Sequence, residues 1–244
     1  LNGARDGEKV LVKITVWPKS AEKPFGEVVA ILGMPGSNDT EMLSILYNQG
    51  INPIFPDAVL EEAERVPVEL DENEISTRRD FRSTLTFTID PFDARDFDDA
   101  ISYHELENGH YDLGVHIADV SHYVRPGMAM DAEALLRSNS VYLVDRVIPM
   151  LPEQLSNIAC SLRPHEDKYT FSAVFEMDDK GKVYKEWYGK GVIHSDRRFT
   201  YEEAQQVIET GAGDLKEEIL LMHSLAQKLR QERFSHGAIT FDKV

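Results

Sequence analysis

The first third of the chain shows apolar and polar residues in alternation. Residues 8–32 alternate in two runs around a turn that contains proline and lysine, a pattern that predicts a β-hairpin. Two strands alone are only marginally stable, so the hairpin is expected to belong to a small β-domain over residues 1–50. Residues 51–82 are rich in acidic residues and prolines, and they are predicted to form a connector with one short helix.

A second domain is predicted from residue 83 to residue 244. Leu85, Phe87 and Ile89 alternate with threonines, the period of two that is expected of a strand. A second strand is predicted over residues 111–124, a helix near 130–138 and a hairpin over 168–195. Strands mixed with helices in this way indicate an α+β fold.

Two helices are predicted near the end of the chain. The first begins at Thr200 with Glu203 at the spacing of a capping box. The second carries an apolar stripe with helical spacing, which is expected to face the core: Leu215, Ile219, Met222, Ala226 and Leu229.

Composition narrows the class of protein. Apolar residues make up 42% of the 244 positions, enough for one large or two small domains. The single cysteine, Cys160, excludes an internal disulfide framework and favours a reducing compartment, for which the cytoplasm is the default. No apolar run is long enough for a membrane span. A formal net charge of −17 argues against broad nonspecific binding to nucleic acid, because such binding depends on clustered Lys and Arg.

Five aspartates gather within ten positions of the stretch "TIDPFDARDFDDA". Asp90 ends a predicted buried strand, Pro91 breaks the strand, and Asp96, Asp98 and Asp99 follow around an apolar Phe97. Like charges about 4 Å apart repel by roughly 4 kcal/mol at an effective dielectric of 20. Arg95 can offset only one of them, so a further positive group is expected at this place.

A divalent cation is the natural candidate for that group. Mg²⁺ takes oxygen ligands and binds carboxylates together with substrate phosphate oxygens, and two such ions can drive phosphoryl transfer. A solvated acidic loop is the alternative. An EF-hand fails because a register from Asp96 puts Ile101 at the glycine position, and an aspartyl-phosphate enzyme is disfavoured because Phe92 stands where a second aspartate is needed.

The same stretch resembles the signature of the ribonuclease II and ribonuclease R family, whose catalytic domain is the RNB domain. Four further segments resemble family segments in the expected order: "IADVSHYVRPG", "SVYLVDRVIPMLPEQLSNIACSLRP", "GAITFD" and, before the aspartates, "NGARDGEKVLVKITVWP" with "FGEVVAILG". The resemblance implies the C-terminal part of an OB-type cold-shock barrel followed by the N-terminal part of an RNB domain, a twisted mixed sheet with packed helices. The sequence of the segment "DARDFDDA" resembles that of ribonuclease R more than that of ribonuclease II.

The resemblance also implies roles for individual residues. Asp90 and Asp99 match the clearest Mg²⁺ ligands, Asp98 the residue most tied to the chemical step, and Asp96 a supporter of the metal cluster or of the RNA end. Asp93 falls in the variable part of the motif and receives no role. Tyr142 matches an aromatic residue that stacks on a base near the RNA 3′ end, although the local pattern alone would favour a core tyrosine.

The implied activity is processive hydrolysis of single-stranded RNA from its 3′ end to nucleoside 5′-monophosphates, with Mg²⁺ as cofactor and Mn²⁺ as a possible substitute. The implied protein is cytoplasmic, monomeric and without a membrane partner. The sequence is read as a fragment that lacks a downstream pair of family arginines, so it is expected to keep the metal site with little or no activity of its own. Two alternatives remain: an RNA-binding module without catalysis, and a metal-dependent phosphatase acting on small molecules.

Two other groups of polar residues invite a functional interpretation. His116, Asp119 and His122 suggest zinc, but on a strand the two histidines share a face that Asp119 does not. Arg197 and Arg198 precede the capped helix. An ordinary surface or helix-start role is favoured for them over contact with phosphate.

Overall fold

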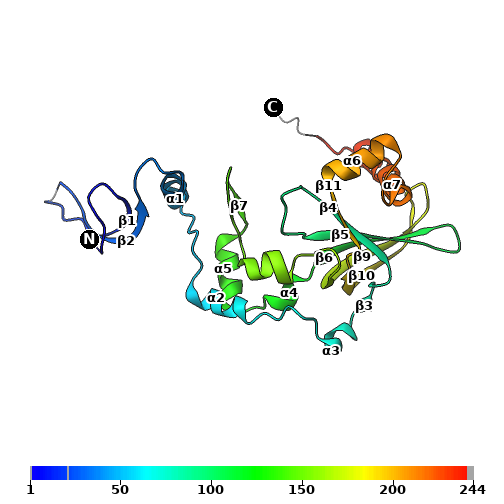
Figure 1. Cartoon of the computed structure of the whole chain (residues 1–244), viewed down its shortest axis with the longest axis horizontal. Coiled ribbons are helices and arrows are strands. Elements are labelled where there is room, and N and C mark those ends of the chain that lie inside the picture. Colours follow the sequence, from blue (N-terminus) through cyan, green and yellow to red (C-terminus); the bar gives the residue numbers. More distant parts are fainter. Residues whose placement is uncertain (1, 21, 241–244) are drawn as a thin grey trace. The chain divides into compact units, whose positions relative to one another are not determined.

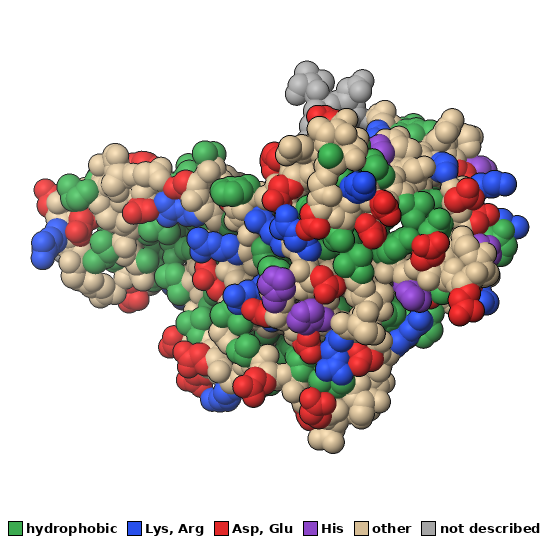
Figure 2. All heavy atoms as spheres, turned by 45° about the vertical axis from the view of Figure 1, so that its right-hand side comes forward, with side chains coloured by type: hydrophobic (Ala, Val, Ile, Leu, Met, Phe, Trp, Pro, Cys, Tyr) green, Lys and Arg blue, Asp and Glu red, His purple; other side chains and the backbone are tan. Residues whose placement is uncertain are grey.

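The computed structural model describes residues 2–20 and 22–240, and these residues form two compact units. One unit comprises residues up to 60 together with residues 133–150, and the other comprises residues 61–132 and those from 151 onward. Residues 241–244, which include the end of the segment "GAITFD", lie outside the described residues. No helix in the described ranges is long and apolar enough to cross a membrane. A space-filling view shows acidic and basic side chains interspersed with hydrophobic ones on the face that it presents (Figure 2).

The first unit is built on the predicted hairpin. Strands β1 (Lys9–Val16) and β2 (Phe25–Gly33) pair in antiparallel fashion. Helix α1 (Asn38–Asn48) follows, capped by Ser37, and an ion pair from Lys9 to Glu41 ties it to β1 at 2.5 Å. The sequence prediction missed this helix, although Ser37 and the acidic first turn are ordinary helix-start signals.

A short excursion at residues 133–150 completes this unit. It contains the end of α5 (Ala129–Arg137) and a two-stranded ribbon, β7 (Val141–Tyr142) and β8 (Val147–Ile148). Asp145 accepts a hydrogen bond from Asn38 at 2.5 Å, and Arg146 pairs with Asp39 at 2.7 Å. These contacts hold the ribbon on α1, about a hundred residues away in the sequence.

The second unit is organised around one mixed sheet. Among the described residues the sheet has seven strands in the order β11-β4-β5-β6-β9-β10-β3 (Figure 1). The strands are β3 (Arg79–Asp80), β4 (Leu85–Asp90), β5 (Asp99–Glu105), β6 (Tyr111–Ala118), β9 (Asp167–Met177), β10 (Val183–His194) and β11 (Arg197–Thr200). The pairs β11–β4 and β10–β3 are parallel, and the four inner pairs are antiparallel.

Short helical segments precede and interrupt this sheet. They are α2 (Asp57–Glu64), α3 (Glu72–Ile75), α4 (Val120–Tyr123) and a π-helical turn over Gln154–Ala159. The connector therefore carries two helices rather than the one predicted.

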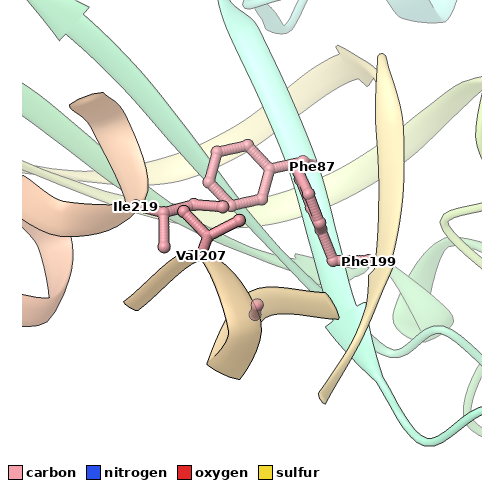
Figure 3. Packing of buried hydrophobic residues seen from close by; sticks show 5 residues of the cluster. Phe87, Phe199, Val207 and Ile219 are labelled. Carbon is pink, nitrogen blue, oxygen red and sulfur yellow. The ribbon is translucent and has the colours of Figure 1, made fainter. Parts of the chain in front are cut away.

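Helices α6 (Tyr201–Thr210) and α7 (Lys216–Ser235) pack at the β11–β4 end of the sheet, where Phe87 and Phe199 meet edge to face with ring centres 5.6 Å apart (Figure 3). Val207 and Ile219 close this cluster. The capping box of Thr200 and Glu203 is confirmed. The predicted core stripe of α7 is only half correct: Ile219 is buried and Leu215 and Met222 pack on the core, whereas Ala226 and Leu229 are exposed. The stripe therefore packs on the core in the first half of the helix and is exposed from Ala226 onward.

Candidate functional site: an aspartate cluster at one edge of the sheet

Two antiparallel strands bring the aspartates together. Asp90 ends β4 and Asp99 begins β5, so the end of one strand and the start of the next lie at the same edge of the sheet, with Asp96 and Asp98 in the loop between them. Pro91 ends the strand because it has no N–H for the ladder. The turn then closes with a hydrogen bond from the Ala94 N–H to the Pro91 carbonyl at 3.1 Å.

The end of this loop next to β5 is held by residues 161–162, which are distant in the sequence. Phe97 is buried, and its N–H donates to the Ser161 hydroxyl at 3.1 Å. Ser161 in turn donates to the Arg95 carbonyl at 2.9 Å, and the Leu162 N–H donates to the Phe97 carbonyl at 2.8 Å. The embedded phenylalanine that made the acidic stretch unusual is thus an anchor for the loop.

The end of the loop next to β4 is held by Arg198 on β11. Its Nη2 donates to the Pro91 carbonyl at 2.5 Å and to the Phe92 carbonyl at 2.9 Å. Sequence reasoning did not find this role, because backbone carbonyls leave no trace in a sequence pattern.

Burial and mutual repulsion perturb the carboxylates. Asp90 is only 8% exposed, and its Oδ2 is a buried oxygen with no hydrogen-bond partner among the described residues. Burial raises the pKa of Asp90 and the negative charges of Asp99 and Asp96 raise it further, whereas the Thr88 hydroxyl and the charge of Arg198 lower it without outweighing the burial. Although the Asp98 side chain is open to solvent at the surface, partial desolvation raises its pKa, with further contributions from Asp96, Asp99 and Asp90.

The four carboxylates lie within electrostatic range of one another, but they do not converge on one point. Within residues 2–20 and 22–240, no group of three or more His, Cys, Asp or Glu side chains forms a ready metal site. The donor chemistry nevertheless fits a hard divalent cation, since all four side chains offer carboxylate oxygens and one buried oxygen lacks a partner.

Tyr142 belongs to the first unit, whereas the four aspartates belong to the second. It stands on β7, and 69% of its surface is exposed. It is therefore a surface residue, not the core tyrosine that its local pattern favours.

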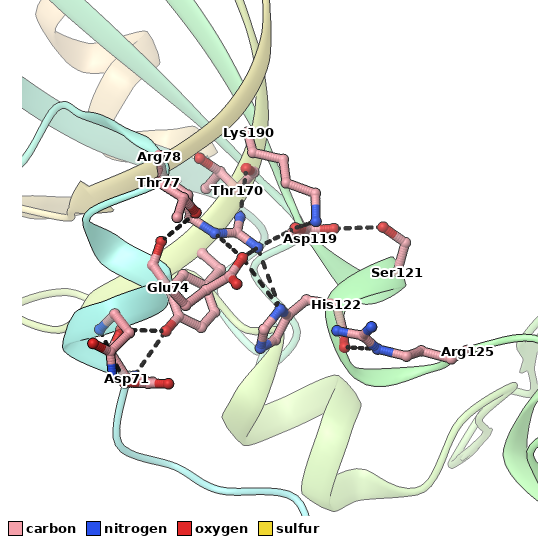
Figure 4. A network of polar contacts seen from close by, with 12 residues as sticks. Asp71, Glu74, Thr77, Arg78, Asp119, Ser121, His122, Arg125, Thr170 and Lys190 are labelled. Atoms are coloured by element: carbon pink, nitrogen blue, oxygen red, sulfur yellow. Dashed lines mark hydrogen bonds and ion pairs between the residues drawn. The ribbon is translucent and has the colours of Figure 1, made fainter.

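The two histidines and Asp119 have structural partners. His116 lies on β6, whereas Asp119 follows that strand and His122 lies on α4, so the strand predicted over residues 111–124 ends at Ala118. His116 is fully buried between the hydroxyls of Ser172 at 2.7 Å and Ser102 at 2.8 Å, and burial lowers its pKa to about 4. Asp119 and His122 both contact Arg78, with an ion pair of 2.7 Å between Asp119 and the guanidinium (Figure 4). His116 thus takes part in an interaction separate from that of Asp119 and His122.

The two units define a class of protein: a small β-domain followed by an α+β domain whose sheet carries a cluster of aspartates at the ends of two strands. A model of the RNB domain matches residues 78–244, and a model of the cold shock domain matches residues 1–56. The chain therefore belongs to the RNB family.

Curated relatives of known name agree with this placement. Ribonuclease R 1 of Lactococcus lactis is 42% identical over 96% of this chain, and ribonuclease R of Thermotoga maritima is 39% identical over 98%. The chain spans about a third of their length, with 30% and 35% covered.

Solved structures show the same fold. Mycoplasma genitalium RNase R in complex with ribose-methylated single-stranded RNA matches all of this chain and 38% of its own, with a TM-score of 0.88 and 26% identity. Yeast Ssd1, described as a pseudonuclease, matches 94% of this chain and 29% of its own, with a TM-score of 0.75 at 22% identity. The latter likeness concerns the fold alone.

Proposed function

We propose that this chain carries the metal-holding carboxylates of an exoribonuclease that hydrolyses single-stranded RNA processively from its 3′ end and releases nucleoside 5′-monophosphates. One observation carries the proposal: four aspartates share one sheet edge, and Asp90 has a buried oxygen without a partner. A charge in that position is costly unless a cation compensates it. The RNA substrate rests on the family relatives, since Mycoplasma genitalium RNase R has been solved with RNA.

The aspartates take different parts in this proposal. Asp90 and Asp99 would hold Mg²⁺, or Mn²⁺ in its place, because they lie on the two strand ends and are the most firmly fixed by the sheet. Asp96 would support them from the loop. Bound Mg²⁺ would lower the pKa of water and stabilise the leaving oxygen.

Asp98 would take part in the chemical step. Asp98 is an exposed residue of the loop whose carboxylate is partly desolvated, and its raised pKa supports a role in accepting the proton of the attacking water at one of its Oδ atoms. Water adds to the last phosphorus, the bond to the 3′ oxygen of the penultimate nucleotide breaks, and a nucleoside 5′-monophosphate leaves. The exposed Tyr142 ring would stack on a base near the 3′ end, a contact of about 1–3 kcal/mol that reads no sequence.

A time course on 5′-labelled single-stranded RNA, run with the whole protein, tests the proposal. In Mg²⁺ the label should collapse to a very short product, and EDTA or Asp98→Asn should prevent this. Asp93→Asn is the matched control, because Asp93 is an exposed aspartate of the same loop and receives no role. Loss of one charge there should leave the rate within about twofold.

Other outcomes would replace the proposal. Degradation by Asp98→Asn at the native rate would remove Asp98 from the chemical step, and degradation in EDTA would remove the metal-holding role of the other aspartates. RNA that binds but survives in every lane would favour a binding role without catalysis. Release of inorganic phosphate from nucleotides with RNA left intact would indicate a phosphatase.

A further inference from the structure

Arg197 and Arg198 are neighbours on β11, but they act in different places. Arg197 donates through Nε to Asp214 at 3.1 Å and through Nη2 to Glu203 at 3.3 Å. Its guanidinium lies 4.5 Å from the ring centre of Phe199. Arg197 therefore braces β11 against the loop and helix that follow it.

Arg198 acts on the aspartate loop. Its position in β11 pairs with Thr88, two residues before Asp90 on β4. One nitrogen, Nη2, reaches the carbonyls of both Pro91 and Phe92, and the guanidinium carbon lies 5.4 Å from the ring centre of Phe97. A single side chain thus contacts the first two residues of the loop and its apolar anchor near the other end.

Both carbonyls lie in the turn where the chain leaves the sheet, and the Pro91 carbonyl also accepts from the Ala94 N–H at 3.1 Å. The chain leaves the sheet at Pro91, so its carbonyl groups can no longer be paired by a regular strand ladder. Hydrogen bonds from a charged donor are stronger than neutral ones. Arg198 thereby supplies at the end of the loop next to β4 what Ser161 and Leu162 supply at the end next to β5.

The position of Arg198 also leaves Asp90 available. The charge of Arg198 acts on the Asp90 carboxylate, yet the described residues include no ion pair within 4 Å between the two, and Asp90 Oδ2 stays without a hydrogen-bond partner. The Nη2 group of Arg198 donates to two carbonyls, and its Nε is a buried donor without a hydrogen-bond partner among the described residues. Arg198 thus holds the loop through hydrogen bonds, while its charge offsets part of the rise in the Asp90 pKa.

We propose that Arg198 is a positioning residue that fixes the loop at residues 91–98, and with it the spacing of the four aspartates, through the carbonyls of Pro91 and Phe92. The contacts establish the hold on the loop; the consequence for catalysis rests on the exoribonuclease function proposed above. Arg198 does not touch the reacting atoms.

Limited proteolysis under native conditions tests the hold directly. Arg95 lies exposed in the middle of the loop, so trypsin cleavage after Arg95, followed by mass spectrometry, reports how often the loop opens. Arg198→Gln should speed this cleavage about tenfold, the ratio that corresponds to ~1.4 kcal/mol. Arg197→Gln is the matched control and should leave the cleavage at the native rate. Arg198→Lys should cleave more slowly than Arg198→Gln, because an ammonium can still donate to the carbonyls.

Equal cleavage in Arg198→Gln and the native protein, or equal acceleration in Arg197→Gln, would overturn the proposal. If Arg198→Gln does not fold, Arg198→Met, which also removes every donor, is compared with Arg197→Met in its place: faster cleavage after Arg95 in Arg198→Met supports the hold, and equal cleavage overturns it.

RNA turnover supplies the second readout. A displaced loop should lower kcat about tenfold with KM for RNA unchanged, since the loop spaces the carboxylates and does not grip the strand. A rise in KM at native kcat would assign Arg198 to RNA binding and overturn the positioning role. If the native protein does not hydrolyse RNA at all, the proposed function fails, while the proteolysis still decides whether Arg198 holds the loop.

Discussion

Arg78 is a buried charge whose removal should be strongly destabilising. Its side chain is fully buried, and its guanidinium forms ion pairs of 2.7 Å with both Glu74 and Asp119 (Figure 4). It also donates to the Thr170 carbonyl at 3.3 Å and lies 4.2 Å from the ring centre of Tyr169. In Arg78→Met the apolar volume is kept but both carboxylates lose this partner.

The magnitude follows from the burial of Asp119. Its side chain is 1% exposed, so without Arg78 it depends on the Ser121 hydroxyl at 2.6 Å and on Lys190 at 4.0 Å. Breaking a buried pair by removal of one partner costs about 3–5 kcal/mol, and in a domain of this size each kcal/mol lowers Tm by roughly 2–4 °C. Arg65→Met is the control, because the ion pair from Arg65 to Glu61 is exposed and such pairs contribute about 0–1 kcal/mol.

Urea unfolding at two pH values tests the reasoning. Burial alone would raise the pKa of Asp119, but Ser121 and Arg78 outweigh it and hold the pKa below its usual value. The stabilisation is therefore present above the unfolded pKa of about 3.9 and is lost as the pH falls through the lowered folded pKa. The loss in Arg78→Met should be large at pH 7 and smaller below about pH 4.

A double variant separates the ion pair from packing. Arg78→Met with Asp119→Asn leaves no buried charge at Asp119 and should be less destabilised than the sum of the single variants by about 1–3 kcal/mol. A loss below about 1 kcal/mol in Arg78→Met at pH 7, or strictly additive variants, would refute the view that Asp119 is held by its charge partner.

Two further predictions concern the edge of aspartates and its support. Asp90→Asn should stabilise the metal-free protein by about 1–2 kcal/mol at pH 7, because it removes a buried charge. The pKa of Asp90 is raised in the folded protein, so this charge destabilises the native protein above that pKa, and the destabilisation fades as the pH falls through it. The same variant should abolish any rise in Tm on addition of Mg²⁺, and melting curves in EDTA and in Mg²⁺ measure both effects. Thr200→Ala should lower the free energy of unfolding by about 1 kcal/mol, because the capping box with Glu203 is lost. If Mg²⁺ raises the Tm of this variant as much as that of the native protein, the effect is local to α6.

The sequence predicts features that depend on near neighbours. The alternation before Asp90, the break at Pro91 and the capping box at Thr200 are local signals, and the structure has the strand, the loop and the cap where they were expected. Helix α1 was missed because a short, mixed segment after the hairpin shows no clear stripe.

Features that depend on distant partners could not be predicted. The ribbon at residues 133–150 joins the first unit through Asn38 and Asp145, a pairing across about a hundred residues that no local pattern encodes. The exposed part of the α7 stripe shows the same limit, since the spacing of Ala226 and Leu229 predicts burial but both residues are exposed. Arg198 was assigned an ordinary role for a related reason, because its partners are backbone groups.

Two buried aspartates, Asp119 and Asp90, differ in how their charges are compensated and in the direction of their pKa shifts. Asp119 follows β6 and is matched by Arg78 at 2.7 Å, so its pKa is lowered and its charge is compensated within the fold. Asp90 ends β4 with an unpartnered oxygen, repelled by neighbouring carboxylates, and its pKa is raised. A fold that can bury an aspartate with its counter-ion has left Asp90 without one, while the nearby Arg198 is directed to carbonyls. A buried charge that its neighbours compensate only in part is expected where a site is built for a ligand rather than for stability.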